Sequence, residues 1–362
     1  MSRFYPVKVK SVKKTTADCS LISLDISEAA AGDFRFRQGQ HLTLKALIDG
    51  EEVRRSYSLC SSPLDNEWQV AVKTVEGGRF STYANERLKA GDTIEVMPPS
   101  GRFYVEVEPE QQKNYVAFAA GSGITPIISI IKTHLQLEPR STFKLFYINQ
   151  AVSTIILKEE LEGLKNVYMG RLEIFHFLTR EERSVPLFNG RLDKTKLDIL
   201  FKTLIDPEAV DEYFICGPNP MIFLVRDYLL DLETDPKHLH FELFNTDGIP
   251  QNEKPKKRSA PDDNLRSDIN IREGGKHFRF SMVRGSENIL DAALKKNADL
   301  PFACKGGVCC TCRAKLLEGE VEVVVNYGLE QEEIDEGYIL TCQSIPTSEK
   351  IVVDFDASIS KH

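Results

Sequence analysis

The sequence predicts a multi-domain chain with three folded segments: an antiparallel β-barrel, a parallel-sheet α/β domain and a small cysteine-bearing domain. Three observations predict this order. Apolar and polar residues alternate in the first segment, continuous apolar runs separate helical patterns in the second, and four spaced cysteines mark the third. The predicted boundaries are 1–110, 111–245, a linker at 246–266, and 267–362. A chain of 362 residues is long enough to bury several domain-sized cores.

The first segment carries the pattern of short antiparallel strands. Val7-Lys8-Val9, Leu42-Thr43-Leu44 and Ile94-Glu95-Val96 alternate apolar with polar residues, and Gly and Pro punctuate the runs between them. Strands of this kind bury one face only, which is typical of an antiparallel barrel or sandwich.

The second segment changes period after Lys113. Tyr115 to Ala119 is a continuous apolar run, which suits a strand buried on both faces, and a glycine turn and a helical pattern follow it. Later runs repeat this order, with strands expected at Phe143–Ile148, Leu172–Leu178 and Tyr213–Cys216. Strands that alternate with helices predict a parallel sheet. The following residues, 246–266, hold Gly, Pro and basic residues with few apolar ones, so we expect a linker.

The cysteines of the third segment predict an iron-sulfur cluster. Cys304, Cys309 and Cys312 read C-x4-C-x2-C, and Cys342 follows 30 positions later, which is the spacing of a plant-type 2Fe-2S cluster. A structural zinc site or disulfides are the alternatives, although zinc sites favour paired C-x2-C knuckles and only one such pair occurs. Cys310 is interpreted as a small packed residue.

Composition and charge limit the partners. A net charge of −8 argues against nucleic acid or an anionic membrane as the main partner. The longest apolar stretch, Tyr115 to Ile131, is interrupted by Gly and Pro and is too short to span a bilayer. Eight cysteines are few for this length, so we expect a cytoplasmic protein. The segment from Arg313 to His362 contains four Lys/Arg and eleven Asp/Glu residues. This acidic segment either steers a basic partner or only keeps the protein soluble.

Two patterns in the first segment indicate a flavin site. Arg55-Ser56-Tyr57-Ser58 ends one predicted strand, and Gly77 to Thr82 places two glycines before a helix expected at Thr82–Leu88. Backbone amides at a helix start attract phosphate, and arginines add charge-assisted contacts. Tyr57 can lie against an aromatic ring, and the Ser58 hydroxyl can bond its edge. A glycine turn with surface arginines is the alternative.

Two patterns in the second segment indicate a pyridine nucleotide. Gly121-Ser122-Gly123-Ile124-Thr125-Pro126 follows a buried strand, but Pro126 stands where a dehydrogenase fingerprint has its third glycine. The amide-rich turn can still bind pyrophosphate. Cys216-Gly217-Pro218 follows the fourth strand, where its thiol can touch a nicotinamide. A buried cysteine before a turn is the alternative.

The chain resembles the ferredoxin-NADP reductase superfamily over nearly its whole length. The resemblance is carried by four motifs in a fixed order: R-x-Y-S, G-G-x-x-S, G-x-G-x-T-P and C-G-P. With a ferredoxin-like domain at the C-terminus, the chain resembles reductase components of bacterial oxygenases, and within them the family of phenylacetyl-CoA 1,2-epoxidase reductase subunits. The strings Arg35 to Lys45, Val72-Lys73 with Glu76 to Ser81, and Asp299 to Cys309 carry this resemblance. It implies a β-barrel for FAD, an α/β domain for NADPH or NADH, and an α+β β-grasp domain for the cluster.

The resemblance also implies roles for individual residues. The implied FAD ligands are Arg55, Tyr57, Ser58, Lys73, Gly78, Arg79 and Ser81. The implied nicotinamide nucleotide ligands are Gly121, Gly123, Thr125, Pro126, Cys216, Gly217 and Pro218. Tyr57, Ser58 and Cys216 would act at the reacting rings, and Phe244 would cover the other face of the flavin. Relatives often carry Arg directly after the second α/β strand, whereas Gln150 stands here.

The implied activity is electron transfer from NAD(P)H through FAD and the cluster to an oxygenase, with a di-iron protein complex as partner. Two rival functions remain at this point. One is a reductase for a ring-hydroxylating dioxygenase or another soluble monooxygenase. The other is a ferredoxin-type carrier fused to a non-functional reductase domain.

Overall fold

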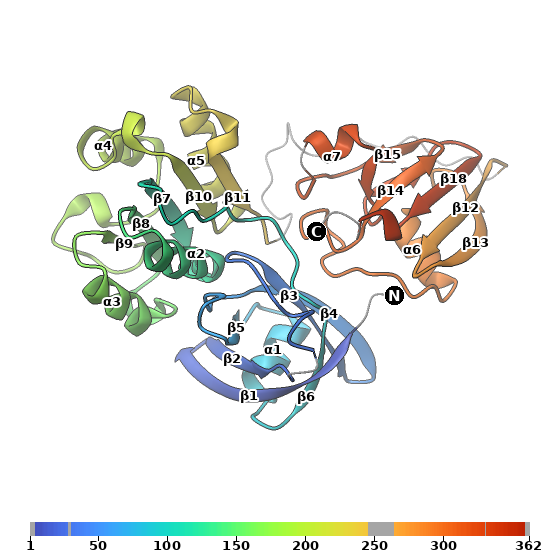
Figure 1. The fold of residues 1–362 in the computed structure, drawn as a ribbon, viewed down its shortest axis with the longest axis horizontal. Coiled ribbons are helices and arrows are strands. Elements are labelled where there is room, and N and C mark those ends of the chain that lie inside the picture. The colour runs from blue at the N-terminus through green and yellow to red at the C-terminus, as the bar shows by residue number, and fades with distance from the viewer. Residues whose placement is uncertain (1–3, 28–29, 245–263, 330, 359–362) are drawn as a thin grey trace. The chain divides into compact units, whose positions relative to one another are not determined.

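The computed structural model describes residues 4–27, 30–244, 264–329 and 331–358. Residues 4–244 form one compact unit, and the C-terminal residues form a second (Figure 1). Most of the predicted linker, residues 246–263, lies outside the described residues. Its last predicted residue, Arg266, already begins a strand.

The first part of the larger unit is a six-stranded antiparallel sheet in the order β4-β3-β6-β1-β2-β5. A bridge between Leu59, directly after β4, and Val70 of β5 joins the two edge strands, so the sheet closes on itself. This confirms the predicted antiparallel barrel. The strands are β1 (Tyr5–Thr16), β2 (Cys19–Asp25), β3 (His41–Ile48), β4 (Glu51–Ser58), β5 (Trp68–Lys73) and β6 (Thr93–Val96).

The core of the barrel comes from the inward side chains of these strands and from one helix, α1 (Arg79–Glu86). Leu42, Leu44 and Val96 are fully buried, because alternate strand residues point inward. Phe80 and Ala84, one helical turn apart, add the apolar side of α1. The helix starts earlier than the predicted Thr82, since Gly78 takes the extended N-cap conformation.

The second part of the larger unit is a five-stranded parallel sheet in the order β11-β10-β7-β8-β9. Figure 1 shows α2 and α3 on one side of this sheet and α4 and α5 on the other. Covering both faces explains the continuous apolar runs and confirms the predicted α/β domain. The elements are β7 (Asn114–Ala120), α2 (Ile124–Leu137), β8 (Thr142–Asn149), α3 (Lys158–Val167), β9 (Leu172–Leu178), α4 (Lys194–Thr203), β10 (Glu212–Cys216), α5 (Asn219–Asp231) and β11 (Leu239–Glu242).

A buried polar network holds the barrel against the α/β domain. His134 of α2 contacts Gln38 of the barrel at 3.3 Å and Glu138 at 3.1 Å, and Tyr115 of β7 donates to Glu138 at 2.8 Å. Burial alone would raise the pKa of Glu138, but its hydrogen bonds to His134, Tyr115 and Ser141 lower it. Nearby, Ser129 of α2 donates to the Ser61 carbonyl at 2.6 Å. These contacts fix the two halves of the site relative to each other.

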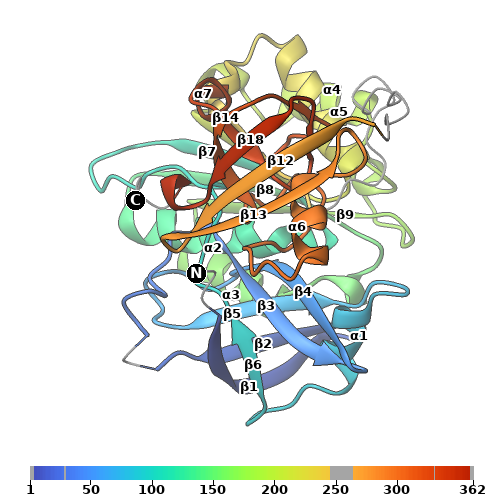
Figure 2. The ribbon, with the colours of Figure 1, turned by 90° about the vertical axis from the view of Figure 1, so that its right-hand side faces the viewer.

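The C-terminal unit has a mixed five-stranded sheet, β13-β12-β18-β14-β16, and a two-stranded sheet, β15-β17. Helix α6 buries Ile289, Leu290 and Ala293 in the core of this sheet (Figure 2). This mixed sheet with a packed helix confirms the predicted α+β domain. The elements are β12 (Arg266–Glu273), β13 (Lys276–Val283), α6 (Ile289–Lys295), β14 (Arg313–Glu318), β15 (Val321–Val323), α7 (Gln331–Asp335), β16 (Tyr338–Leu340), β17 (Ser344–Pro346) and β18 (Lys350–Asp354).

Candidate functional site

The end of β4 presents three of the side chains predicted to bind flavin. Tyr57 is half-buried, its ring lies 5.5 Å from that of Phe80, and burial raises the pKa of its phenol, so it stays neutral. Arg55 is exposed and donates to the Arg54 carbonyl at 2.7 Å. Within the described part of the chain it makes no ion pair, which leaves its charge available to an anion. Ser58 is buried at the strand end.

The glycine turn before α1 fits a phosphate group. Gly78 caps α1 without any side-chain hydrogen bond, so the first helical amides are open to a ligand. The Ser81 hydroxyl accepts from Val75 N at 3.1 Å and donates to Gly78 O at 3.0 Å, which holds the turn in shape. A Cβ added to Gly78 would come within 2.5 Å of the Ser81 hydroxyl, so only glycine fits.

Two further predicted flavin ligands already have protein partners. Arg79 pairs with Glu51 and donates to the Ile48 carbonyl at 2.7 Å. Lys73, at the end of β5, lies 3.5 Å from a carboxylate oxygen of Asp18. A phosphate at either cation would have to compete with these carboxylates, and both assignments stay predictions.

The predicted nicotinamide residues meet where β7 and β10 end. A Cβ on Gly123 would lie 2.0 Å from the Cys216 carbonyl oxygen, so only glycine permits this backbone approach. Gly217 is also closely packed, since a Cβ added to it would lie 2.8 Å from Met221 Cε and 3.0 Å from Ala120 Cβ. The Thr125 hydroxyl donates to the Ser122 carbonyl at 3.0 Å and closes the turn. The structure therefore brings the two glycine turns together.

The prolines of these turns fit the starts of their helices. Pro126 lies in the first turn of α2, and Pro218 precedes α5 as its N-cap residue. A proline there removes no helical hydrogen bond, because the first amides have no intrahelical acceptor. Gly121 adopts a left-handed conformation, φ +54°, and its carbonyl accepts from the Tyr147 hydroxyl at 2.9 Å.

A buried carboxylic acid that the sequence did not reveal joins the two halves. Glu242, the last residue of β11, accepts a hydrogen bond from the Ser58 hydroxyl at 3.1 Å and lies in register with Cys216 on β10. Burial raises the pKa of Glu242 to about 8 and raises that of the Cys216 thiol, so both are neutral at pH 7. The available signal was an acid inside the apolar run Phe241 to Phe244. Phe244 itself, two residues further on, is 38% exposed.

The second strand of the parallel sheet ends at Asn149, with Gln150 exposed directly after it. The Arg180 amide donates to the Gln150 carbonyl at 2.8 Å, so a second loop runs beside this strand end. The Asn149 side-chain Nδ2 is buried with no hydrogen-bond partner among the described residues. Uncharged groups therefore stand where an acidic residue would accept a ribose hydroxyl.

The four predicted cluster ligands lie in two pairs. Cys304 and Cys309 interact through their thiols. This contact, together with backbone amides such as that of Gly306, lowers the pKa of the Cys304 thiol to about 6. The same contact raises the pKa of the Cys309 thiol. Cys312 contacts Cys342 in the same way, which raises the pKa of Cys312. Two pairs suit a cluster with two irons, each taking two thiolates. All eight cysteines are free thiols, so the disulfide alternative is not formed.

The loop that carries these cysteines is built around sulfur. The Gly306 amide donates to Cys304 Sγ at 3.2 Å, and the Cys304 amide donates to Cys309 Sγ at 3.5 Å. Donors aimed at sulfur stabilise thiolates and hence an iron-sulfur cluster. Among the residues described, no three His, Cys, Asp or Glu side chains surround one ion position.

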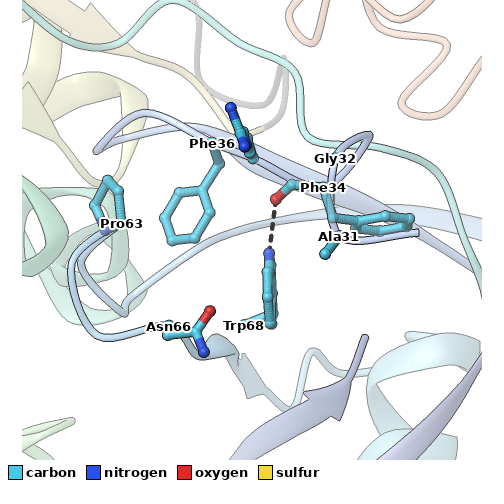
Figure 3. A pocket seen from close by; sticks show the side chains of 8 residues that line it. Ala31, Gly32, Phe34, Phe36, Pro63, Asn66 and Trp68 are labelled. Carbon is cyan, nitrogen blue, oxygen red and sulfur yellow. Dashed lines mark hydrogen bonds between the residues drawn. The ribbon is translucent and has the colours of Figure 1, made fainter. Parts of the chain in front are cut away.

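A surface pocket of about 510 Å³ lies elsewhere in the barrel unit (Figure 3). Trp68, Phe36, Pro63 and Asn66 line it, and the Trp68 indole donates to the Phe34 carbonyl at 2.8 Å. None of the predicted flavin or nicotinamide residues contributes to its walls. It is therefore distinct from the residues that converge at Glu242.

Three family models match successive parts of the chain. An oxidoreductase FAD-binding domain matches residues 6–104, an oxidoreductase NAD-binding domain matches 118–227, and a 2Fe-2S iron-sulfur cluster binding domain matches 271–347. One subunit of the 1,2-phenylacetyl-CoA epoxidase of Escherichia coli K12 is 44% identical over 99% of both chains. The chain belongs to the family of oxygenase reductases with FAD, NAD and 2Fe-2S domains.

Other relatives support the same family. The ferredoxin reductase component of a 3-ketosteroid-9-alpha-monooxygenase from Rhodococcus rhodochrous is 31% identical and covers 98% of this chain and 97% of its own. The solved phthalate dioxygenase reductase, 23% identical, matches 97% of this chain and 98% of its own with a TM-score of 0.59, which shows the shared fold. No helix among the described residues is both long and apolar enough to cross a membrane.

The reductase thus carries electrons from NAD(P)H through FAD and a 2Fe-2S cluster to an oxygenase. This confirms the activity and cofactor classes predicted from the sequence. Both the FAD and the NAD models match, which favours a working reductase over a carrier with a non-functional reductase domain. The roles of individual site residues stay predictions.

Proposed function

We propose that the reductase serves a di-iron oxygenase that epoxidises phenylacetyl-CoA during aerobic phenylacetate degradation. The observation that carries this proposal is the 44% identity to the E. coli epoxidase polypeptide, over 99% of both chains. The reductase components of 3-ketosteroid-9-alpha-monooxygenases reach 33%, over 89% of this chain.

In this proposal the residues at the flavin and nicotinamide each have one task. Bound FAD accepts a hydride and releases its two electrons singly, which is the chemistry that the cofactor supplies. Tyr57 supports the flavin ring, and the hydroxyl of Ser58 is fixed at the ring edge by its bond to Glu242. Gly123 and Gly217 let the two nucleotide-binding turns approach each other closely, and in this arrangement Cys216 would face the nicotinamide.

Reconstitution tests the partner. The purified reductase is mixed with the oxygenase component of the E. coli epoxidase, NADPH and phenylacetyl-CoA, and NADPH oxidation and substrate loss are followed. We expect substrate consumption that depends on the reductase and is close to that given by the homologous E. coli polypeptide. The oxygenase component of a 3-ketosteroid-9-alpha-monooxygenase is the comparison acceptor. Faster, coupled turnover with that component, and none with the epoxidase, would contradict the proposal.

A further inference from the structure

The pocket of Figure 3 has the dimensions of a small-molecule site. Its volume is about 510 Å³, and sites for small ligands usually enclose roughly 300–1,000 Å³. Residues 31–36, which precede β3, form one wall, and residues 63–68, which lead into β5, form the other. Since no predicted flavin, nicotinamide or cluster ligand lines it, a molecule bound here would be additional to the cofactors.

The apolar part of the lining is suited to a flat ring. In Figure 3 the rings of Phe36 and Pro63 lie on one side of the space, and the Trp68 indole lies on the other. Phe36 and Trp68 are both half-buried, so each keeps part of its ring open to a ligand. An aromatic ligand between them would gain apolar contact area and the attraction between neighbouring rings.

The polar part of the lining favours an anion. Arg35 is the one charged residue of the lining, and Asn66 supplies a carboxamide. Within the described part of the chain, neither side chain has a hydrogen bond or an ion pair. Two acids nearby, Asp25 and Glu67, line a separate hollow of about 160 Å³ together with Lys10. The guanidinium in the larger pocket is therefore available to a negatively charged ligand.

The walls are held in place without a ligand. The Trp68 indole donates to the Phe34 carbonyl at 2.8 Å, which fixes the orientation of its ring. On the opposite loop, Asp65 Oδ2 accepts from the Ser62 amide at 2.9 Å and pairs with Lys132 Nζ of α2 at 2.8 Å. A site whose walls are already ordered loses less conformational entropy on binding.

The donors present suit a carboxylate better than a phosphate. A phosphate monoester carries about −1.5 to −2 charge near neutral pH, whereas the lining offers a single guanidinium. Phosphate sites commonly add the free amides of a helix start, and no lining residue belongs to a helix. One guanidinium matches one carboxylate in charge and can hold it through two parallel hydrogen bonds.

We propose that this pocket binds a small aromatic monocarboxylate. The ring lies between Phe36 and Trp68, the carboxylate pairs with Arg35, and the Asn66 amide donates a further hydrogen bond. Binding is non-covalent and does not depend on which oxygenase the reductase serves. The site therefore adds a ligand-binding function to a chain whose other described sites handle hydride and electrons.

Calorimetry on the full-length holoprotein tests this site, with hydrocinnamate as the probe. We expect one hydrocinnamate to bind per chain. Trp68 is the only tryptophan, so its emission should change with the same midpoint as the heat of binding. The uncharged hydrocinnamamide and the ringless acid hexanoate should each bind at least about fivefold more weakly, because each lacks one of the two contacts.

Variants separate the charge from the ring. Arg35→Gln, at an exposed residue, should weaken hydrocinnamate at least about fivefold and leave hydrocinnamamide unchanged. Phe36→Leu should weaken both compounds, because they share the ring. Arg37→Gln is the matched control, since Arg37 is an exposed arginine that pairs with Glu106 and lies outside the lining. Wild-type reduction of ferricyanide by NADPH in all three variants would show that each has folded and holds FAD.

Four results would overturn the proposal. The first is the absence of binding heat at millimolar hydrocinnamate. The second is equal affinity of the wild-type protein for hydrocinnamate and its amide, because the carboxylate would then make no contact. The third is unchanged hydrocinnamate affinity in Arg35→Gln, or binding heat without a change in Trp68 emission, since the probe would then lie elsewhere. The fourth is tighter binding of AMP than of hydrocinnamate, lost in Arg35→Gln, which would identify a phosphate site instead.

Discussion

Glu212 offers a test in which the structure sets both sign and magnitude. This carboxylate begins β10 and lies 2.9 Å from Lys113 Nζ and 2.9 Å from His240 of β11. Burial alone would raise its pKa, but these partners lower it from 4.5 to about 2. Such a fall corresponds to about 3 kcal/mol of stability. Because the partner side chains are about a quarter exposed, we expect about 2–3 kcal/mol.

The sign follows from the folded and unfolded pKa values. A carboxyl with a depressed folded pKa stabilises the protein fully above pH 4.5, and the contribution disappears as the pH falls toward 2. Glu212→Gln should therefore lose about 2–3 kcal/mol at pH 7 and less than half of that at pH 3. Because β10 ends at Cys216 and β11 at Glu242, the variant should also loosen the nicotinamide side of the site.

Urea unfolding measures this difference. Trp68 is the only tryptophan in the chain and lies in the larger unit, so its emission in flavin-free protein reports that unit alone. Glu173→Gln, at an exposed acid on β9 of the same sheet, is the matched control. A single hydrogen bond usually contributes about 1 kcal/mol to the free energy of unfolding. A loss of unfolding free energy below about 0.5 kcal/mol at pH 7, or an equal loss at pH 7 and pH 3, would therefore refute the reasoning.

Three further predictions concern the cofactors. The purified protein should contain about one FAD and two irons per chain by absorbance and metal analysis, and zinc without iron would contradict the cluster. Cys342→Ser should lose the cluster, since serine is a poor ligand where a soft thiolate is needed. Ferricyanide reduction through the flavin should persist, while reduction of one-electron protein acceptors should collapse. Unchanged oxygenase-coupled turnover would show that the cluster does not lie on the electron-transfer path. NADPH should be preferred to NADH by kcat/KM because no acid follows β8, and Gln150→Arg should increase that preference; higher kcat/KM with NADH would show that the missing arginine matters more.

The fold was predictable because its main signals are local. Strands covered on both faces are mostly apolar, so β7, β8 and β10 could be found from single runs of sequence. The edge strand β9 was found from the apolar residues on either side of its exposed acid, Glu173. The cluster ligands are equally local, apart from Cys342. Helices α4 and α5 were not predicted, since α4 buries only Leu197 and Leu200 and presents a weak pattern.

The site was less predictable because its central contacts are distant in the sequence. Ser58 and Glu242 are 184 positions apart and meet only once β4 and β11 are assembled. Motifs identified the hydroxyl and the thiol but not the acid between them.

The distribution of titratable groups between the two units follows from the charge that each unit handles. The larger unit receives a hydride, so a proton must later leave it. In this unit burial raises the pKa of the Glu242 carboxyl and lowers that of the His41 imidazole. The cluster accepts electrons alone. Around it the described hydrogen bonds to the ligand sulfurs come from the backbone amides of Gly306 and Cys304, which stabilise negative charge without gaining or losing protons. A change of pH should therefore alter hydride and proton steps in the larger unit, while electron acceptance by the cluster should depend mainly on the hydrogen bonds to its thiolates.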